Sequence, residues 1–357
     1  FLYRPMLNLT FWADAMIAGL KPWAYHLTNI AIHALTAVLF FVLLMRIGHS
    51  RQASFAGALL FSVHPLLVPA VAWIPGRNDA LLGLFLIGSL IYLSDYLRKG
   101  GGYSYLLSVL LFTMAAFTKE TALVYPLLAG FFIMFANRQN GSPGFKKILM
   151  ATGWLAAIIV WVLFRSMAHK GHLDPSMTMN SLFTIIKIFT ASLGKIFLPL
   201  DLSFIQDMAD IKIIYGLISV ILVMAMSSIG GIDRKWLFIW GLAWFAVFVI
   251  PIAAVKWENN ALMEHRLYVP LLGMIVALLE VRSFKRLAEV RSIGLLVVPF
   301  MLASFYLTNN YKDDLTCWKY VVKKSPGSAL AKNALGDAYY KRRDYASSES
   351  SFLGSLQ

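Results

Sequence analysis

Residues 24–45 have the sequence AYHLTNIAIHALTAVLFFVLLM, and this stretch decides the fold class. It contains no Asp, Glu, Lys or Arg, and Arg46 follows it directly. As an α-helix it would be about 33 Å long, which matches the roughly 30 Å hydrocarbon core of a bilayer. The stretch therefore predicts a transmembrane helix.

The composition of the whole chain also indicates a membrane protein. Of its 357 residues, 59% are hydrophobic and 14% are charged, whereas soluble domains carry about 25% charged residues. A soluble core could not bury so much apolar surface, so we predict an all-α, polytopic membrane protein. Much of the net charge of +14 falls in short loops between apolar runs, which indicates membrane topology and argues against nucleic acid as a partner. The single cysteine, Cys317, excludes an intramolecular disulfide.

Ten apolar runs are candidate membrane spans. They lie at 24–45, 53–68, 80–97, 103–118, 121–137, 147–166, 211–229, 236–254, 267–281 and 292–308. Basic residues recur in alternate loops between the runs: Arg46, Arg51, Arg98, Lys99, Arg138, Lys146, Lys147, Arg234, Lys235, Arg282, Lys285, Arg286 and Arg291. The positive-inside rule predicts that these loops are cytoplasmic and that the opposite loops face a periplasm or lumen. The opposite loops hold Asp14, Asp79, Glu120, Asp174, Asp201, Asp207, Asp210, Glu258 and Glu264.

The segment 182–198 tests this alternation, because a further span there would invert the topology downstream. Its polar residues recur mostly three to five positions apart and so share one helical face: Ser181, Thr184, Lys187, Ser192 and Lys195. A helix with such a face lies in the membrane interface more readily than it spans the bilayer. We therefore expect an interfacial helix anchored by its lysines, with an ordinary eleventh span as the alternative.

From residue 309 onward the chain is soluble in composition. The stretch 328–356, SALAKNALGDAYYKRRDYASSESSFLGSL, has the layout of a tetratricopeptide repeat. Its small and aromatic packing positions are Leu335, Gly336, Tyr339, Ser348, Phe352 and Ser355. We predict a membrane domain at 1–308 and the start of a tetratricopeptide-repeat domain at 309–357. About three repeats are needed to bury a solenoid core, so we expect further repeats beyond Gln357.

Three charged interruptions share the non-cytoplasmic side. HPLLVPAVAWIPGRND (64–79) carries His64, Arg77 and Asp79, FTKETALVYP carries Lys119 and Glu120, and WENNALMEHRLY (257–268) carries Glu264, His265 and Arg266. Ionisable residues at span ends are candidates for function, and their common side suggests one water-filled site. The alternative is that the charged pairs are interfacial anchors, that the histidines are hydrogen-bonded helix residues, and that the tryptophans form an aromatic belt.

The same segments resemble a known family. YRPMLNLTFWADAMIAGLKPWAYHLTNIAIH (3–33), HPLLVPAVAWIPGRND, FTKETALVYP and MEHRLYVPLLG (263–273), followed by a tetratricopeptide-like tail, are similar in order to the GT-C polytopic glycosyltransferases with tetratricopeptide repeats. That family includes the transmembrane and tetratricopeptide-repeat O-mannosyltransferases and bacterial relatives. The chain departs from the family pattern at Pro69, where a glutamate is common.

The resemblance implies an enzyme that transfers a sugar from a polyprenyl-phosphate donor to a protein or glycan acceptor on the outer face. It implies catalytic roles for Asp79, Glu120 and Asp14 and donor-phosphate contacts for Arg77, Lys119, Arg266 and Arg4, while His64, Glu264 and His265 are further candidates. The family's first-loop acidic pair precedes its YRP segment, so we expect it, with the first transmembrane helix, ahead of Phe1. No cofactor follows from the sequence; a divalent metal, Mg²⁺ or Mn²⁺, stays open.

Two other function classes fit the composition. A transporter or flippase of lipid-linked sugars would have a similar number of spans, but such proteins usually show internal repeats, which we do not find. A non-catalytic scaffold would bind protein partners through its repeats. We expect a bacterial inner membrane with the repeats in the periplasm; an endoplasmic reticulum membrane is the alternative.

Overall fold

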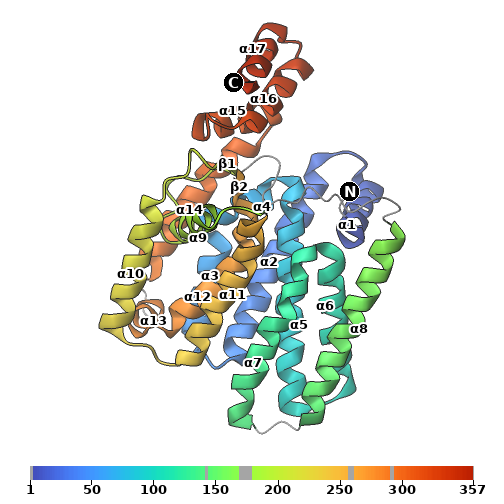
Figure 1. The fold of residues 1–357 in the computed structure, drawn as a ribbon, viewed down its shortest axis with the longest axis vertical. Coiled ribbons are helices and arrows are strands. Elements are labelled where there is room, and N and C mark those ends of the chain that lie inside the picture. The colour runs from blue at the N-terminus through green and yellow to red at the C-terminus, as the bar shows by residue number, and fades with distance from the viewer. Residues whose placement is uncertain (1–2, 141–143, 169–178, 256–260, 290–292, 357) are drawn as a thin grey trace.

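The computed structural model describes residues 3–140, 144–168, 179–255, 261–289 and 293–356, and it is almost entirely helical (Figure 1). The first half contains α1 (Pro5–Ala18), α2 (Pro22–Arg46), α3 (Arg51–Val63), η1 (Pro65–Leu67), α4 (Val68–Ala72), η2 (Ile74–Gly76), α5 (Arg77–Lys99), α6 (Gly102–Thr118), η3 (Glu120–Val124), α7 (Tyr125–Asn140) and α8 (Gly144–Ala168). The second half contains α9 (Leu182–Phe197), β1 (Ile205–Asp207), α10 (Ile214–Gly230), α11 (Lys235–Ala254), β2 (Ala261–Met263), η4 (Glu264–Leu267), α12 (Tyr268–Glu280), α13 (Arg282–Glu289), α14 (Gly294–Thr308), η6 (Asn309–Tyr311), α15 (Asp314–Lys324), α16 (Ala329–Lys341) and α17 (Tyr345–Ser355).

All ten predicted apolar runs overlap helices. Within the described residues, four helical segments are long and apolar enough to cross a membrane: Pro22–Arg46, Ile74–Lys99, Gly144–Ala168 and Lys235–Ala254. Arg51–Val63 with Pro65–Ala72 would be a fifth, bent by 48°. The bend falls at His64-Pro65, because Pro65 cannot continue the hydrogen bonding of α3. The all-α prediction is confirmed, whereas the count of ten spans stays a prediction.

The basic loops gather at one end of the bundle, at the bottom of Figure 1. Arg234 joins three of the predicted cytoplasmic segments, because it donates to the Ile47 carbonyl at 2.5 Å and to the Glu280 carboxylate at 3.1 Å. Arg282 and Lys285 both pair with Asp233, at 3.0 and 2.9 Å. The side-chain contacts therefore agree with the alternation of charge along the sequence.

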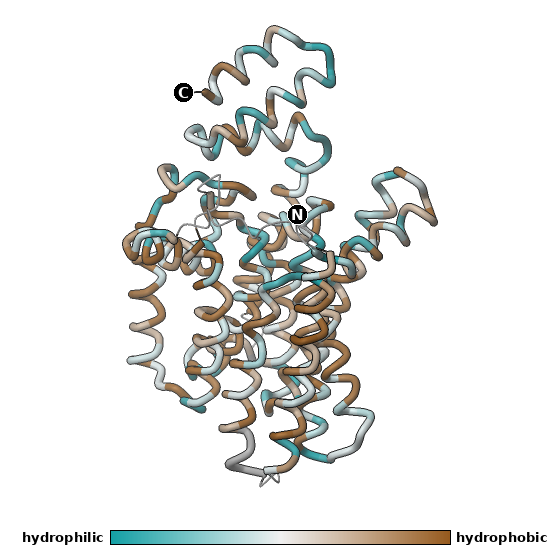
Figure 2. Tube along the Cα trace, turned by 45° about the vertical axis from the view of Figure 1, so that its right-hand side comes forward, coloured by the Kyte–Doolittle hydropathy of each residue, from teal (hydrophilic) through white to brown (hydrophobic). Residues whose placement is uncertain are grey.

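Helix α9 lies across the long helices near the opposite end (Figures 1 and 2). Ser181 caps it by accepting a hydrogen bond from the Thr184 backbone N–H. Its Lys187 donates to the Met208 carbonyl at 2.6 Å. This orientation fits the predicted interfacial helix better than an eleventh span.

The core of the bundle is formed where α5 packs between α2, α6 and α12. Figure 2 shows the apolar character along the long helices and the hydrophilic residues of the tail. Helices α11 and α12 approach closely at Gly273, where an added Cβ would lie 2.5 Å from the Trp244 Cβ. Trp244 is buried and its indole N–H donates to the Val269 carbonyl at 2.9 Å.

Replacing Gly273 with Ala should therefore destabilise the bundle. A methyl group forced against buried Trp244 must displace one of the two helices, and such overpacking costs about 1–3 kcal/mol. Gly294→Ala is the matched control, because nothing lies within 4 Å of a Cβ added there. Thermal unfolding in detergent should show a lower midpoint for Gly273→Ala alone; equal midpoints for both variants would contradict the close approach.

The C-terminal tail forms paired antiparallel helices beyond the end of the bundle that carries the acidic loops (Figure 1). An added Cβ on Gly336 in α16 would lie 2.7 Å from the Phe352 ring in α17, and Ser348 donates to the Gly336 carbonyl at 2.9 Å. Small residues thus allow α16 and α17 to pack closely. The identity of this segment as a tetratricopeptide repeat, and the domain boundary at 308, stay predictions.

Candidate active site

Asp79 and Lys119 form a buried ion pair between two helices. Asp79 lies in the first turn of α5, and Lys119 follows the last residue of α6. The Lys119 Nζ lies 2.6 and 2.8 Å from the two carboxylate oxygens of Asp79. The antiparallel packing of α5 and α6 brings the beginning of one helix to the end of the other, so this pair follows from the predicted topology.

Arg4 and Glu120 form a second ion pair next to the first. Arg4 precedes α1 and Glu120 begins η3. The guanidinium donates to the two carboxylate oxygens of Glu120, at 2.7 and 3.3 Å. This bidentate geometry fixes the start of α1 beside the end of α6.

The residues of η4 complete this arrangement from the second half of the chain. Strands β1 and β2 pair antiparallel, with Gln206 opposite Leu262, and β2 leads directly into η4. His265 is buried, and its Nε2 lies 4.0 Å from the Asp79 Oδ2. The ring of Trp73 lies 5.2 Å from the His265 ring. The His265 Nδ1 has no hydrogen-bond partner among the described residues.

We call this set the charged cluster; it consists of Arg4, Asp79, Lys119, Glu120, His265 and Arg266. Arg266 lies within electrostatic reach of Asp79, Arg4 and Glu120. The cluster holds three cationic side chains and two carboxylates, so its formal charge is net positive. Burial and the nearby Arg266 and Arg4 lower the pKa of Lys119, while Asp79 opposes them.

His265 is neutral at neutral pH. Burial and the positive charges of Lys119, Arg266 and Arg4 hold the pKa of His265 well below its ordinary value. Its contact with Asp79 is therefore a polar contact rather than an ion pair. A neutral imidazole with an unused Nδ1 can accept or donate a hydrogen bond to a ligand.

Asp14 and Arg77 form a separate pair that holds α1 against α2 and α5. Arg77 is fully buried and its NH2 nitrogen lies 2.5 Å from the Asp14 Oδ2. Its other donors reach the Asn29 side chain at 2.6 Å, the Tyr25 carbonyl at 2.9 Å and the Thr10 hydroxyl at 3.2 Å. These groups occupy the guanidinium and hold the three helices together, and the contact of Arg77 with phosphate stays a prediction. Asn29 was not among the predicted site residues, although an Asn inside an apolar run is a signal for such a partner.

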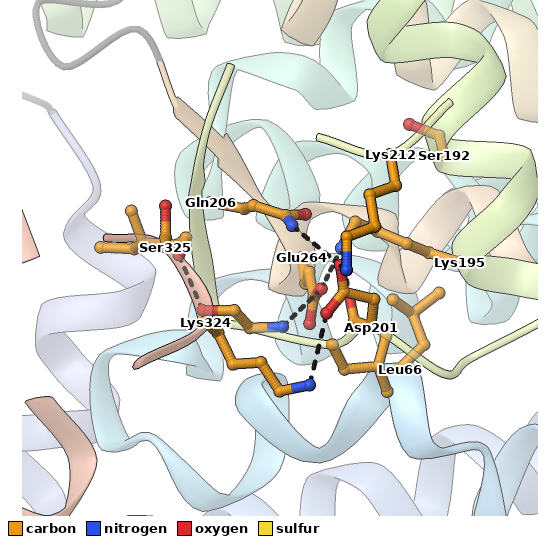
Figure 3. Close-up of polar contacts among 12 residues, drawn as sticks. Leu66, Ser192, Lys195, Asp201, Gln206, Lys212, Glu264, Lys324 and Ser325 are labelled. Atoms are coloured by element: carbon orange, nitrogen blue, oxygen red, sulfur yellow. Dashed lines mark hydrogen bonds and ion pairs between the residues drawn. The ribbon is translucent and has the colours of Figure 1, made fainter. Parts of the chain in front are cut away.

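Glu264 and Lys195 form another buried ion pair, which joins η4 to α9 (Figure 3). The Glu264 Oε1 also accepts from the Ser203 backbone N–H at 2.8 Å, while its Oε2 has no hydrogen-bond partner among the described residues. Burial raises the pKa of Glu264, and Lys195 opposes that effect. Lys195 thus pairs inside the protein instead of anchoring α9 at a membrane surface.

His64 and the divalent metal that the sequence leaves open are the remaining candidates. The His64 Nε2 lies 3.0 Å from the Ile196 carbonyl and its Nδ1 accepts from the Leu66 N–H at 3.2 Å, so both nitrogens are engaged at the bend after α3. Within the described ranges, no three His, Cys, Asp or Glu side chains gather closely enough to hold a metal ion. The pairing of both cluster carboxylates with cations does not fit a divalent metal.

The segment that contains most of this site is also similar to a known protein family. Residues 4–165 match the family model described as dolichyl-phosphate-mannose-protein mannosyltransferase. This part of the chain is similar to these mannosyltransferases. The matched region contains Arg4, Asp79, Lys119 and Glu120 of the charged cluster, whereas η4 lies outside it.

Individual relatives agree with the family match. The human protein O-mannosyl-transferase TMTC1 is 36% identical over 158 residues, which are 39% of this chain and 17% of the relative. The mouse protein O-mannosyl-transferase TMTC3 is 28% identical over 201 residues, 55% of this chain and 20% of the relative. The chain thus spans about a fifth of the length of these curated relatives. No solved structure matches the chain. With its apolar helices, this relationship identifies an integral membrane protein.

Proposed function

We propose that the chain is a membrane mannosyltransferase that takes its sugar from a polyprenyl-phosphate donor and transfers it to a hydroxyl of a protein or glycan acceptor. The observation that carries the proposal is the charged cluster. Chain segments that are distant in sequence bring three cations and two carboxylates together at one end of an apolar bundle. An apolar bundle with an anion site at its end suits a lipid carrier whose only charge is a phosphate.

The proposed reaction gives one role to the carboxylates of the cluster and another to its cations. The acceptor hydroxyl attacks the anomeric carbon, a carboxylate accepts the hydroxyl proton, and the bond between that carbon and the phosphate oxygen breaks. Negative charge develops on the departing phosphate, and Lys119, Arg266 and Arg4 are our candidates to stabilise it. Asp79 is our candidate for the base, because it lies between Lys119 and the neutral His265. Glu120 would then position Arg4.

The tail would face the same side as the cluster. Its helices lie beyond the end of the bundle that carries α1 and α4 (Figure 1). Asp79 and Glu120 begin α5 and η3, next to α4 and α1. We propose that this side is periplasmic or lumenal, since the basic loops lie at the other end, and that the tail recruits protein partners or presents the acceptor. Inside-out and right-side-out vesicles treated with protease would test the assignment; cleavage of the tail from the cytoplasmic side would overturn it.

Arg266 provides a direct test of the donor site. We expect Arg266→Gln to raise the KM for a polyprenyl-phosphate mannose donor about tenfold or more, because a charge-assisted contact to phosphate is lost. Arg234→Gln, at the opposite end of the bundle, is the control for loss of a partly buried arginine. Transfer assays with purified protein should show activity with the polyprenyl-phosphate donor. No transfer, or an unchanged KM in the Arg266 variant, would contradict the proposed site.

A further inference from the structure

A groove of about 600 Å³ separates the tail from the membrane bundle. One wall is the end of α14 with the segment 199–202, and the other wall is α15. The first wall is mainly apolar and includes Leu200 and Leu307, while the second carries Lys319, Lys323 and Lys324. We call this feature the α15 groove.

The α15 groove lies where a lipid headgroup would meet the protein. Helix α14 runs from the basic end of the bundle toward the tail (Figure 1). It exposes large apolar side chains along its length, and Leu302 and Phe305 are 60% and 76% exposed. Tyr306, which lines the groove, lies in the last turn, where interfacial aromatic residues are common. The groove therefore continues a lipid-facing surface into the headgroup region.

The charges of the groove are of one sign. Lys324 is 3.3 Å from Asp201 and is thereby held against the bundle (Figure 3). Lys319 and Lys323 are exposed and lie one helical turn apart on α15. None of the described residues that line the groove carries a carboxylate. Tyr320 donates to the Leu202 carbonyl at 2.7 Å, which fixes the face of α15 that is turned toward the bundle.

We propose that the α15 groove binds the phosphate headgroup of an anionic membrane lipid. Lys319 and Lys323 contact the phosphate, and the acyl chains lie along the exposed apolar face of α14. Lysines near a membrane surface attract anionic lipids, and their aliphatic stems can lie on apolar surface while the ammonium groups stay in water. A bound lipid would hold the tail at a fixed height above the bilayer. This site is independent of the transferase activity proposed above.

Lipid binding to the purified chain tests the proposal. We expect native mass spectrometry to show that phosphatidylglycerol is retained in preference to phosphatidylcholine. Lys319→Gln/Lys323→Gln should reduce that preference by about tenfold or more, because each lysine near the surface contributes appreciably to anionic-lipid binding. The matched control is Lys332→Gln/Lys341→Gln, which removes two positive charges from α16 outside the groove. Thermal unfolding of each variant shows whether the tail remains folded.

Several results would overturn the proposal. The first is equal retention of the two lipids by the unaltered chain, and the second is an equal loss of preference in the α16 control. The third is complete displacement of phosphatidylglycerol by inorganic phosphate, which would identify a site for free phosphate rather than for a membrane lipid. If the groove variant unfolds, Lys319→Arg/Lys323→Arg replaces it; the charge is kept, so the preference should be kept, and its loss would also overturn the proposal.

Discussion

Replacing Asp79 with Asn should abolish sugar transfer, with a fall in kcat of about 10²–10⁴-fold, the range for loss of a general base. The amide keeps the size of the carboxylate but cannot accept the proton of the acceptor hydroxyl. It also leaves the buried Lys119, 2.6 Å from Asp79, without its counterion. The expected result is therefore a loss of kcat that exceeds any change in KM.

Asp95→Asn is the matched control for this experiment. Asp95 lies on the same helix, α5, near its other end, where it pairs with Arg46. Its carboxylate is the same chemical group as that of Asp79, but it lies far from the charged cluster. Full activity in Asp95→Asn with none in Asp79→Asn would support the assigned base. Comparable activity in the two variants, measured as mannose transfer from a polyprenyl-phosphate donor by equally folded protein, would remove Asp79 from the mechanism.

Replacing Lys195 with Met should cause a large loss of stability. The change leaves the carboxylate of Glu264, which is fully buried, without its cation. Breaking a buried ion pair from one side costs about 3–5 kcal/mol. Lys212→Met is the control, because Lys212 is exposed and lies 3.6 Å from Asp201; loss of such a surface pair costs about 0–1 kcal/mol. Chemical denaturation in detergent measures both.

The pH dependence of the Lys195→Met variant gives an independent check. Burial raises the pKa of Glu264, and Lys195 opposes this rise. The Lys195→Met variant lacks that opposing charge. The folded state then binds a proton more tightly than the unfolded state, so stability should increase as the pH falls from neutrality toward the ordinary glutamate range. The double variant Lys195→Met/Glu264→Leu should regain much of the lost stability and lose the pH dependence. If the Lys195→Met variant is as stable as the unaltered chain at pH 7, the ion pair between Lys195 and Glu264 is contradicted.

Much of the fold follows from the sequence because it depends on local patterns. Apolar runs and alternating basic loops place most of the helices. The same alternation puts Asp79 and Lys119 at one end of the bundle, so their proximity could be predicted. The length of a helix is harder to predict. Helix α12, for example, has 13 residues, although the apolar run around it is longer.

The partners within the site could not be predicted, because they depend on contacts between distant segments. The sequence assigns Arg4 and Arg77 the same chemistry, yet Arg77 is enclosed by Asp14, Asn29 and Tyr25. No pattern around 205–207 or 261–263 predicted the short strands that lead into η4. Hydropathy predicts whether a side chain is buried, but it does not predict which of several compatible partners the side chain contacts.

The pairing of Arg4 with Glu120 has a consequence for the order in which the protein can assemble during synthesis. The two residues are 116 positions apart, and α2, α3, α5 and α6 lie between them. A nascent chain therefore has α1 long before it has the carboxylate that fixes its start. Until η3 emerges, Arg4 remains in water or at headgroups, because an unpaired arginine is costly in a bilayer. The charged cluster is thus a late product of membrane insertion, and η4 supplies its last members.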